Sequence, residues 1–173
     1  DRSMVQGWAD RTPADFVMSV KVSRYLTHIR RLREPEEPIR RFLDRAGCLE
    51  SKLGPALLQL PPQLRADVGR LRETLAQFPA SVRVAVEFRH DSWFTDDVRR
   101  LLERHNAAFC LADSPRRRTP VWRTSDWGYL RLHEGTASPR PCYGRTALGS
   151  WVERLAGCWT PDDDVFVYFN NDP

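Results

Sequence analysis

The 173-residue chain has the composition of a globular protein, with 41% hydrophobic and 29% charged residues. No segment approaches the roughly 18 consecutive apolar residues of a membrane-spanning helix, and no charged leader followed by an apolar stretch opens the chain. The net charge is a modest +4, and the four cysteines lack the CxxC spacing of metal sites. We therefore predict a cytoplasmic protein with one domain, residues 1–173, and no membrane contact.

Short apolar segments alternate with amphipathic ones along the chain. In chain order, the predicted elements are the end of a helix at 4–8, a strand at 16–23, a helix at 36–46, a strand at 55–60, a helix at 64–78, a strand at 82–89, a helix after Thr95, strands at 107–113 and 127–133, a helix around 148–155 and a strand at 164–171. Thr95 is a typical N-cap residue, and Gly47 is placed to end the helix at 36–46.

This alternation predicts an α/β fold in which parallel strands are joined by helical crossovers. Six strands are too few to close an eight-stranded barrel. Two architectures remain: an open doubly wound sheet, or a parallel (β/α) TIM-type barrel that lacks its first two strands.

The predicted strands carry charges on one face. In the segment 82–89, Val84, Val86 and Phe88 share a face, whereas Glu87 and Arg89 lie on the opposite one. The segments 16–23 and 127–133 divide in the same way. The apolar faces suit packing against helices, so the polar faces are expected to point into a barrel lumen or a cleft.

Polar residues cluster near the carboxyl ends of the predicted strands, where α/β proteins bind ligands. The candidate ring consists of Lys21, Gln59, Glu87, Arg89, Asp113, Arg131, His133, Asn170 and Asn171. Trp93, shortly after Arg89, is a candidate for lining the cleft. Because burial of an unpaired charge is very costly, these groups must pair with each other or with a ligand. A purely structural ion network is the alternative to a binding site.

Four ordered motifs resemble a known family. LGPALLQLPP (53–62), VEFRHDSWF (86–94), YLRLH (129–133) and VYFNN (167–171) are similar to the domain of unknown function 72, the YecE-like proteins sometimes labelled sugar-isomerase-related. The resemblance spans essentially the whole chain. It implies a TIM-type barrel of about 250 residues, whose usual opening strands are absent from this sequence, and it implies a cleft but no reaction.

The ring suggests that the protein binds or acts on an anionic, sugar-phosphate-like small molecule. Glu87 and Asp113 are candidates for catalytic base and acid, with His133 as a proton shuttle. The candidate substrate-binding residues are Lys21, Gln59, Arg89, Trp93, Arg131, Asn170 and Asn171. Isomerisation and hydrolysis both fit this set, and the sequence identifies no cofactor.

Two further hypotheses use overlapping residues. In a metal-dependent phosphodiesterase, Glu87, Asp113 and His133 would be ligands, although such clusters usually need more histidines and carboxylates. In a nucleic-acid-binding barrel, arginine-rich loops would follow the phosphates and Trp122 or Trp127 would stack on a base. His105, at a predicted helix end, is more simply a residue that complements the helix dipole.

A barrel without two strands would have two exposed edges, which favour association with other chains. The isolated 173-residue chain is therefore expected to be unstable or to associate, as sedimentation and chemical unfolding would show. A monomer that unfolds cooperatively would contradict the missing-strand interpretation.

Overall fold

Helices and strands alternate along the chain in the computed structural model, which describes residues 1–114, 117–135 and 142–169. The helices are α1 (Arg2–Arg11), α2 (Glu36–Ala46), α3 (Val68–Leu75), α4 (Asp96–Arg104) and α5 (Arg145–Ala156), with shorter helical turns η1 (Tyr25–Ile29), η2 (Gly47–Lys52) and η3 (Asp91–Trp93). The strands are β1 (Met18–Lys21), β2 (Leu53–Gln59), β3 (Val84–Glu87), β4 (Ala108–Phe109), β5 (Leu111–Ser114), β6 (Arg117–Arg118), β7 (Gly128–Leu132) and β8 (Val165–Phe169).

The strands form two sheets, ordered β1-β2-β3-β4 and β6-β5-β7-β8. All neighbours are parallel except the short β5–β6 pair. Only Cys110 separates β4 from β5, so the segment 108–114 joins the two sheets by pairing with β3 on one side and with β7 on the other. The six predicted strands are thereby confirmed as one parallel series.

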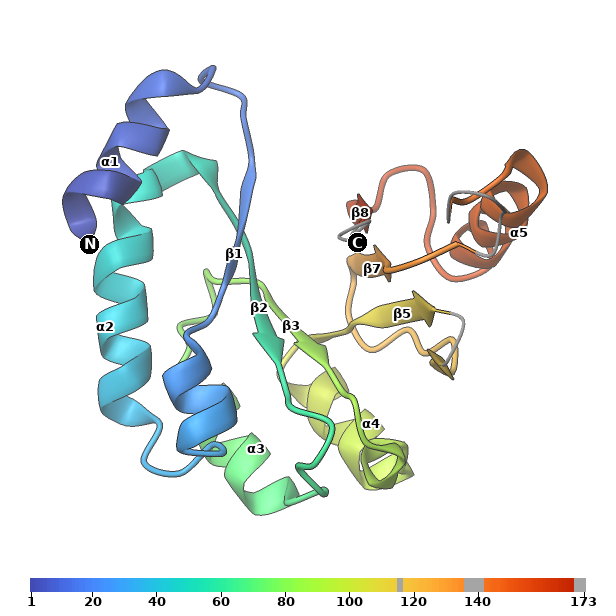
Figure 1. Cartoon of the computed structure of the whole chain (residues 1–173), viewed down its shortest axis with the longest axis horizontal. Coiled ribbons are helices and arrows are strands. Elements are labelled where there is room, and N and C mark those ends of the chain that lie inside the picture. The colour runs from blue at the N-terminus through green and yellow to red at the C-terminus, as the bar shows by residue number, and fades with distance from the viewer. Residues whose placement is uncertain (115–116, 136–141, 170–173) are drawn as a thin grey trace.

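The parallel α/β fold is confirmed, but a closed TIM-type barrel is not. Within the described ranges β1 pairs with β2, and β8 pairs with β7, while β1 and β8 form no ladder with each other. The two strands stand at opposite ends of the curved series in Figure 1. Their outer edges carry no strand partner among the described residues.

The helices lie on the outer side of the curved strands (Figure 1). As predicted, Thr95 is the N-cap of α4, and its side chain accepts a hydrogen bond from the Val98 amide. Gly47 ends α2 as predicted, but with right-handed backbone angles, so the chain continues into the 3₁₀ turn η2. None of the helices in the described residues is long and apolar enough to cross a bilayer.

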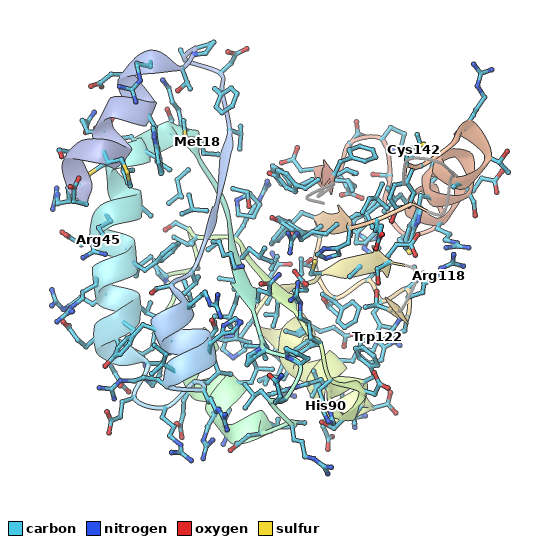
Figure 2. The ribbon with its side chains drawn as sticks, in the orientation of Figure 1. Met18, Arg45, His90, Arg118, Trp122 and Cys142 are labelled. Atoms are coloured by element: carbon cyan, nitrogen blue, oxygen red, sulfur yellow. The ribbon has the colours of Figure 1, made fainter. Side chains whose placement is uncertain are left out.

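The two faces of the strands differ as the alternation predicts. The outer face packs with the helices in the main core, which includes Leu58, Val86, Phe88 and Leu130, and side chains fill this layer in Figure 2. The inner face has a smaller cluster formed by Leu57, Ala85, Ala108, Cys110, Trp127 and Tyr129. The strands curve enough that Ser19 Oγ on β1 lies 2.8 Å from the Tyr129 hydroxyl on β7.

Trp93 belongs to the outer core and does not line a cleft, contrary to its predicted substrate-binding role. Its side chain is fully buried, its ring stacks on Phe88 with centroids 4.9 Å apart, and its Nε1 donates to the Leu64 carbonyl at 2.7 Å. The turn η3 directs Trp93 into the core because His90 caps the turn through the Ser92 amide.

Trp93→Ala should lower the free energy of unfolding by about 3–5 kcal/mol, since it opens a large cavity and leaves a carbonyl without its donor. Urea unfolding followed by circular dichroism measures the loss. Trp8→Ala is the matched control, because Trp8 is 39% exposed and should lose less than half as much. Equal losses for the two variants would contradict the assignment of Trp93 to the core.

Candidate functional site

Glu87 lies at the centre of a charged cluster on the inner face, at the carboxyl end of β3. Its side chain is only 2% exposed. One carboxylate oxygen, Oε1, accepts from Arg89 Nε at 2.9 Å and lies 3.4 Å from His133 Nε2. The other oxygen accepts from Gln59 Nε2 at 2.9 Å and from Arg131 Nη1. Four donor groups therefore surround a carboxylate that has about four acceptor positions.

Gln59 extends this cluster from β3 to β1. Its amide nitrogen donates to Glu87, and its Oε1 accepts from Lys21 Nζ at 2.6 Å. Gln59 and Glu87 are register partners on adjacent strands, so their side chains leave the sheet side by side. The structure thus brings together six of the predicted site residues: Lys21, Gln59, Glu87, Arg89, Arg131 and His133.

The surroundings of Glu87 hold its carboxylate in the ionised form. Burial raises the pKa of Glu87, but the hydrogen bond with His133 and the charges of Arg131 and Arg89 outweigh burial and bring the pKa well below its usual range. A carboxylate with so low a pKa is a weak base, and its acceptor positions are already filled. The geometry therefore suits Glu87 to positioning its neighbours more than to taking a proton.

Positive charge exceeds negative charge around this carboxylate. Arg89 and Arg131 both pair with Glu87, whereas Lys21 contacts only the neutral amide of Gln59 among the interactions of the described residues. Burial and the charge of Arg131 lower the pKa of Lys21, the charge of Glu87 raises it, and Arg89 and Arg24 lower it further, so that the net shift is downward. Crowded cations of this kind are stabilised when an anion binds among them.

Sequence reasoning missed two residues near this mouth, Arg24 and His28. Both follow β1 in the loop that leads to α2. Besides burial, the charge of Arg24 lowers the pKa of Lys21, and the charges of Arg24, Lys21 and Arg89 lower the pKa of His28. The signal available in the sequence was their place just beyond a carboxyl strand end. The predicted polar residues were limited to the strand at 16–23, so the loop that follows it was left out.

Asp113 was predicted to join the ring, but the structure places it on the other face of the strands. Its Oδ2 accepts from Trp151 Nε1 of α5 at 2.7 Å, and Arg118 Nε lies 3.4 Å from Oδ1. Figure 2 shows Arg118 at the β6 end of the sheet, near α5. The alternation explains this, because Asp113 pairs in register with the outward Leu132, whereas Ala112 pairs with Arg131. Asp113 anchors α5 and does not contact Glu87.

Two other predictions concern the ends of the site. Asn170 and Asn171 lie outside the described residues. No group of three or more histidine, cysteine, aspartate or glutamate side chains gathers in the described ranges in a way that would hold a metal ion. The predicted set Glu87, Asp113 and His133 cannot ligate one ion, because Asp113 faces away.

The comparisons with known proteins place the chain in a family. The family model described as protein of unknown function DUF72 matches residues 1–173. The chain belongs to the DUF72 family. None of the curated proteins matches this sequence.

Solved structures of DUF72 proteins share this fold. The crystal structure of a DUF72 family protein from Thermotoga maritima is 26% identical, with a TM-score of 0.83 over 98% of this chain and 72% of that one. A DUF72 family protein from Enterococcus faecalis is 20% identical, with a TM-score of 0.79 over 99% of this chain and 78% of that one. The resemblance seen in the four sequence motifs is therefore confirmed.

Glu87→Gln should destabilise this DUF72 protein by about 3–5 kcal/mol near neutral pH, because it removes the buried counter-ion of the largely buried Arg131 and the partly exposed Arg89. The loss should shrink in acid. The Glu87 carboxylate has a lower pKa in the folded protein than in the unfolded chain, where it is 4.5. Its contribution to stability is therefore complete above pH 4.5 and is lost as the pH falls toward the pKa of the folded state. The slope is at most about 1.4 kcal/mol per pH unit.

Urea unfolding of the wild type and of Glu87→Gln between pH 3 and pH 7 measures this difference. Glu37→Gln is the control, because Glu37 is also paired with two arginines but lies on the exposed surface of α2. Its effect should be small at every pH. A gap between wild type and Glu87→Gln that stays constant down to pH 3 would contradict the ionised, buried carboxylate.

Proposed function

We propose that this DUF72 protein binds an anionic small molecule, of the sugar-phosphate kind, at the carboxyl ends of its parallel strands. One observation carries the proposal. Arg89 and Arg131 donate to the single buried carboxylate of Glu87, while Lys21 is held beside them through Gln59 and has no carboxylate partner of its own among the described contacts. The cluster therefore keeps excess positive charge that a ligand can neutralise.

The chemistry of the cations favours a phosphate or carboxylate group. Guanidinium groups offer planar pairs of donors that match such oxyanions, and Lys21 adds a compact point charge. Glu87 uses only one nitrogen atom of Arg89 and one of Arg131 in its hydrogen bonds. Remaining N–H groups of these partly exposed side chains can donate to a ligand, while Glu87 and Gln59 hold them in place.

The inner face beneath the cations suits the neutral part of such a ligand. Tyr168 is partly exposed and lies against the buried Tyr129, with ring centroids 5.2 Å apart, and Tyr129 is linked to Ser19 by a hydrogen bond. Aromatic rings and hydroxyl groups are common partners of small polar organic molecules. His133, and not Asp113, is the group beside Glu87 that can transfer a proton, so isomerisation or hydrolysis would depend on His133.

The nucleic-acid hypothesis receives less support from the geometry. Trp127 is buried, and Trp122 packs between Phe94 and Phe109 with ring centroids 6.2 and 4.9 Å away. Neither indole is placed to stack on a base. Arg30 pairs with Glu34, and Arg118 with Asp113, so arginines of the predicted phosphate-binding loops have intramolecular partners.

We also propose that the six parallel strands form part of a TIM-type barrel within a single domain. They follow one another in chain order, and contacts such as Arg131–Glu87 and Ser19–Tyr129 cross the inner space between strands that are not neighbours. In a barrel the inner face would be the lumen, and the Glu87 cluster would lie at its carboxyl mouth.

Lys21→Met should weaken the binding of glucose 6-phosphate about tenfold, as expected when one charge-assisted contact to the ligand is lost. Isothermal titration calorimetry measures the affinity. Lys52→Met is the matched control, because the chain has only these two lysines, and Lys52 Nζ donates to the Thr12 carbonyl at 2.8 Å, away from the mouth. This control should lose stability but keep its affinity.

The same titration separates small-molecule binding from nucleic-acid binding. A small anion held by two or three cations should lose little affinity between 50 and 200 mM salt, whereas a nucleic acid contacting about six phosphates would lose about a thousandfold. No binding of either phosphate or glucose 6-phosphate, or equal losses in the two lysine variants, would contradict the proposed function.

A further inference from the structure

The loop that follows β1 has an unusual backbone. Residues Tyr25–Ile29 form a π-helical turn, and Arg31, Leu32 and Glu34 have positive φ angles of 52°, 64° and 46°. π-helical turns are rare in proteins overall, but those that occur are often at functional sites. Left-handed backbone angles are unfavourable for residues with a side chain. Such a conformation persists only where the surrounding contacts enforce it.

Buried contacts hold this loop in place. Leu26, Thr27 and Leu32 are buried, and the Leu32 amide donates to the Leu26 carbonyl at 3.0 Å. Thr27 Oγ1 lies 2.8 Å from Nδ1 of the neighbouring His28. This contact fixes the orientation of the imidazole and leaves Nε2 as its second nitrogen. The loop thus holds an oriented imidazole beyond the carboxyl end of β1, where the charges of Lys21 and Arg89 act on it.

We propose that His28 belongs to the anion site and takes up a proton from solvent when a dianion binds there. This inference rests on the proposed function and adds to it a coupling between ligand and proton. The proton adds to the imidazole, no other bond forms or breaks, and the ring becomes an additional cation beside the ligand.

The charges around His28 provide the coupling. Burial lowers the pKa of His28, and so do the charges of Arg24 in the same loop, Lys21 on β1 and Arg89 beyond β3. In the empty site His28 is therefore mainly neutral at pH 7. A dianion among the same cations cancels their field and attracts the imidazolium, so the pKa of His28 rises.

The sign of the pH dependence follows from this shift. Ligand binding raises the pKa of His28, so affinity is highest below the pKa of the empty site and falls as pH rises through the pKa of the complex. The pKa of His28 in the empty site is lowered from its usual value, so the fall begins at a lower pH than it would for an ordinary imidazole. Affinity should become constant again once His28 is neutral in both states.

Sulfate is the probe, because it remains a dianion throughout this range and any proton uptake must come from the protein. NMR follows the imidazole C–H signals of the intact chain during pH titrations with and without saturating sulfate, with His28→Gln to assign the signal. His105 is the internal control. Burial and Arg104 lower its pKa too, but it follows α4, at the opposite end of the strands.

Sulfate should raise the pKa of His28 and leave that of His105 unchanged. As pH rises, sulfate affinity should fall in the wild type and in His105→Gln, and should fall less in His28→Gln, in which His133 is the remaining imidazole of the cluster. Sulfate binding without a shift of His28 would overturn this inference and leave the proposed function intact. Absence of sulfate binding at any pH would overturn both.

Discussion

Burial of the Glu87 carboxylate is the constraint around which the inner face is built. A carboxylate that leaves water needs donors for its oxygens and a counter-charge, or it must become neutral. Here Gln59, Arg89, Arg131 and His133 satisfy it from three strands and the segments that follow them. Because Arg131 on β7 reaches Glu87 on β3, the ion pair also joins two strands that are not neighbours.

The parallel fold determines where this charge gathers. Alternation along each strand sends one set of side chains to the helices and the other to the inner face, and parallel pairing brings the carboxyl ends together. Lys21 therefore lies beside two arginines, Arg89 and Arg131, that share the single carboxylate of Glu87. Lys21 itself has no carboxylate partner among its described contacts. The structural ion network and the proposed ligand site are thus the same group of residues: Glu87 organises the cations, and the proposal is that their excess charge receives an anion.

The sequence predicted the strands and the central cluster because both follow local rules. Glu87 and Arg89 stand out as charges within an apolar strand, and alternation correctly gives them one face. The prediction for Asp113 was wrong because it relied on the position of this residue at the end of a strand and not on the alternation of side chains along the strand. Ala108, Cys110 and Ala112 occupy the inner face, so Asp113 points outward to Trp151. The burial of Trp93 against Phe88 and the Leu64 carbonyl, and the orientation of His28 within the π-helical turn η1, depend on contacts that strand alternation does not encode.

The position of a bound oxyanion tests the central claim most directly. A crystal of this chain soaked in tungstate, located by its anomalous scattering, would show where excess positive charge is accessible. The account predicts an ion within hydrogen-bonding distance of Lys21 and at least one of Arg89 and Arg131, with the Glu87 contacts preserved. An ion that instead occupies only the outer arginines, such as Arg30 or Arg118, with the mouth empty, would contradict it.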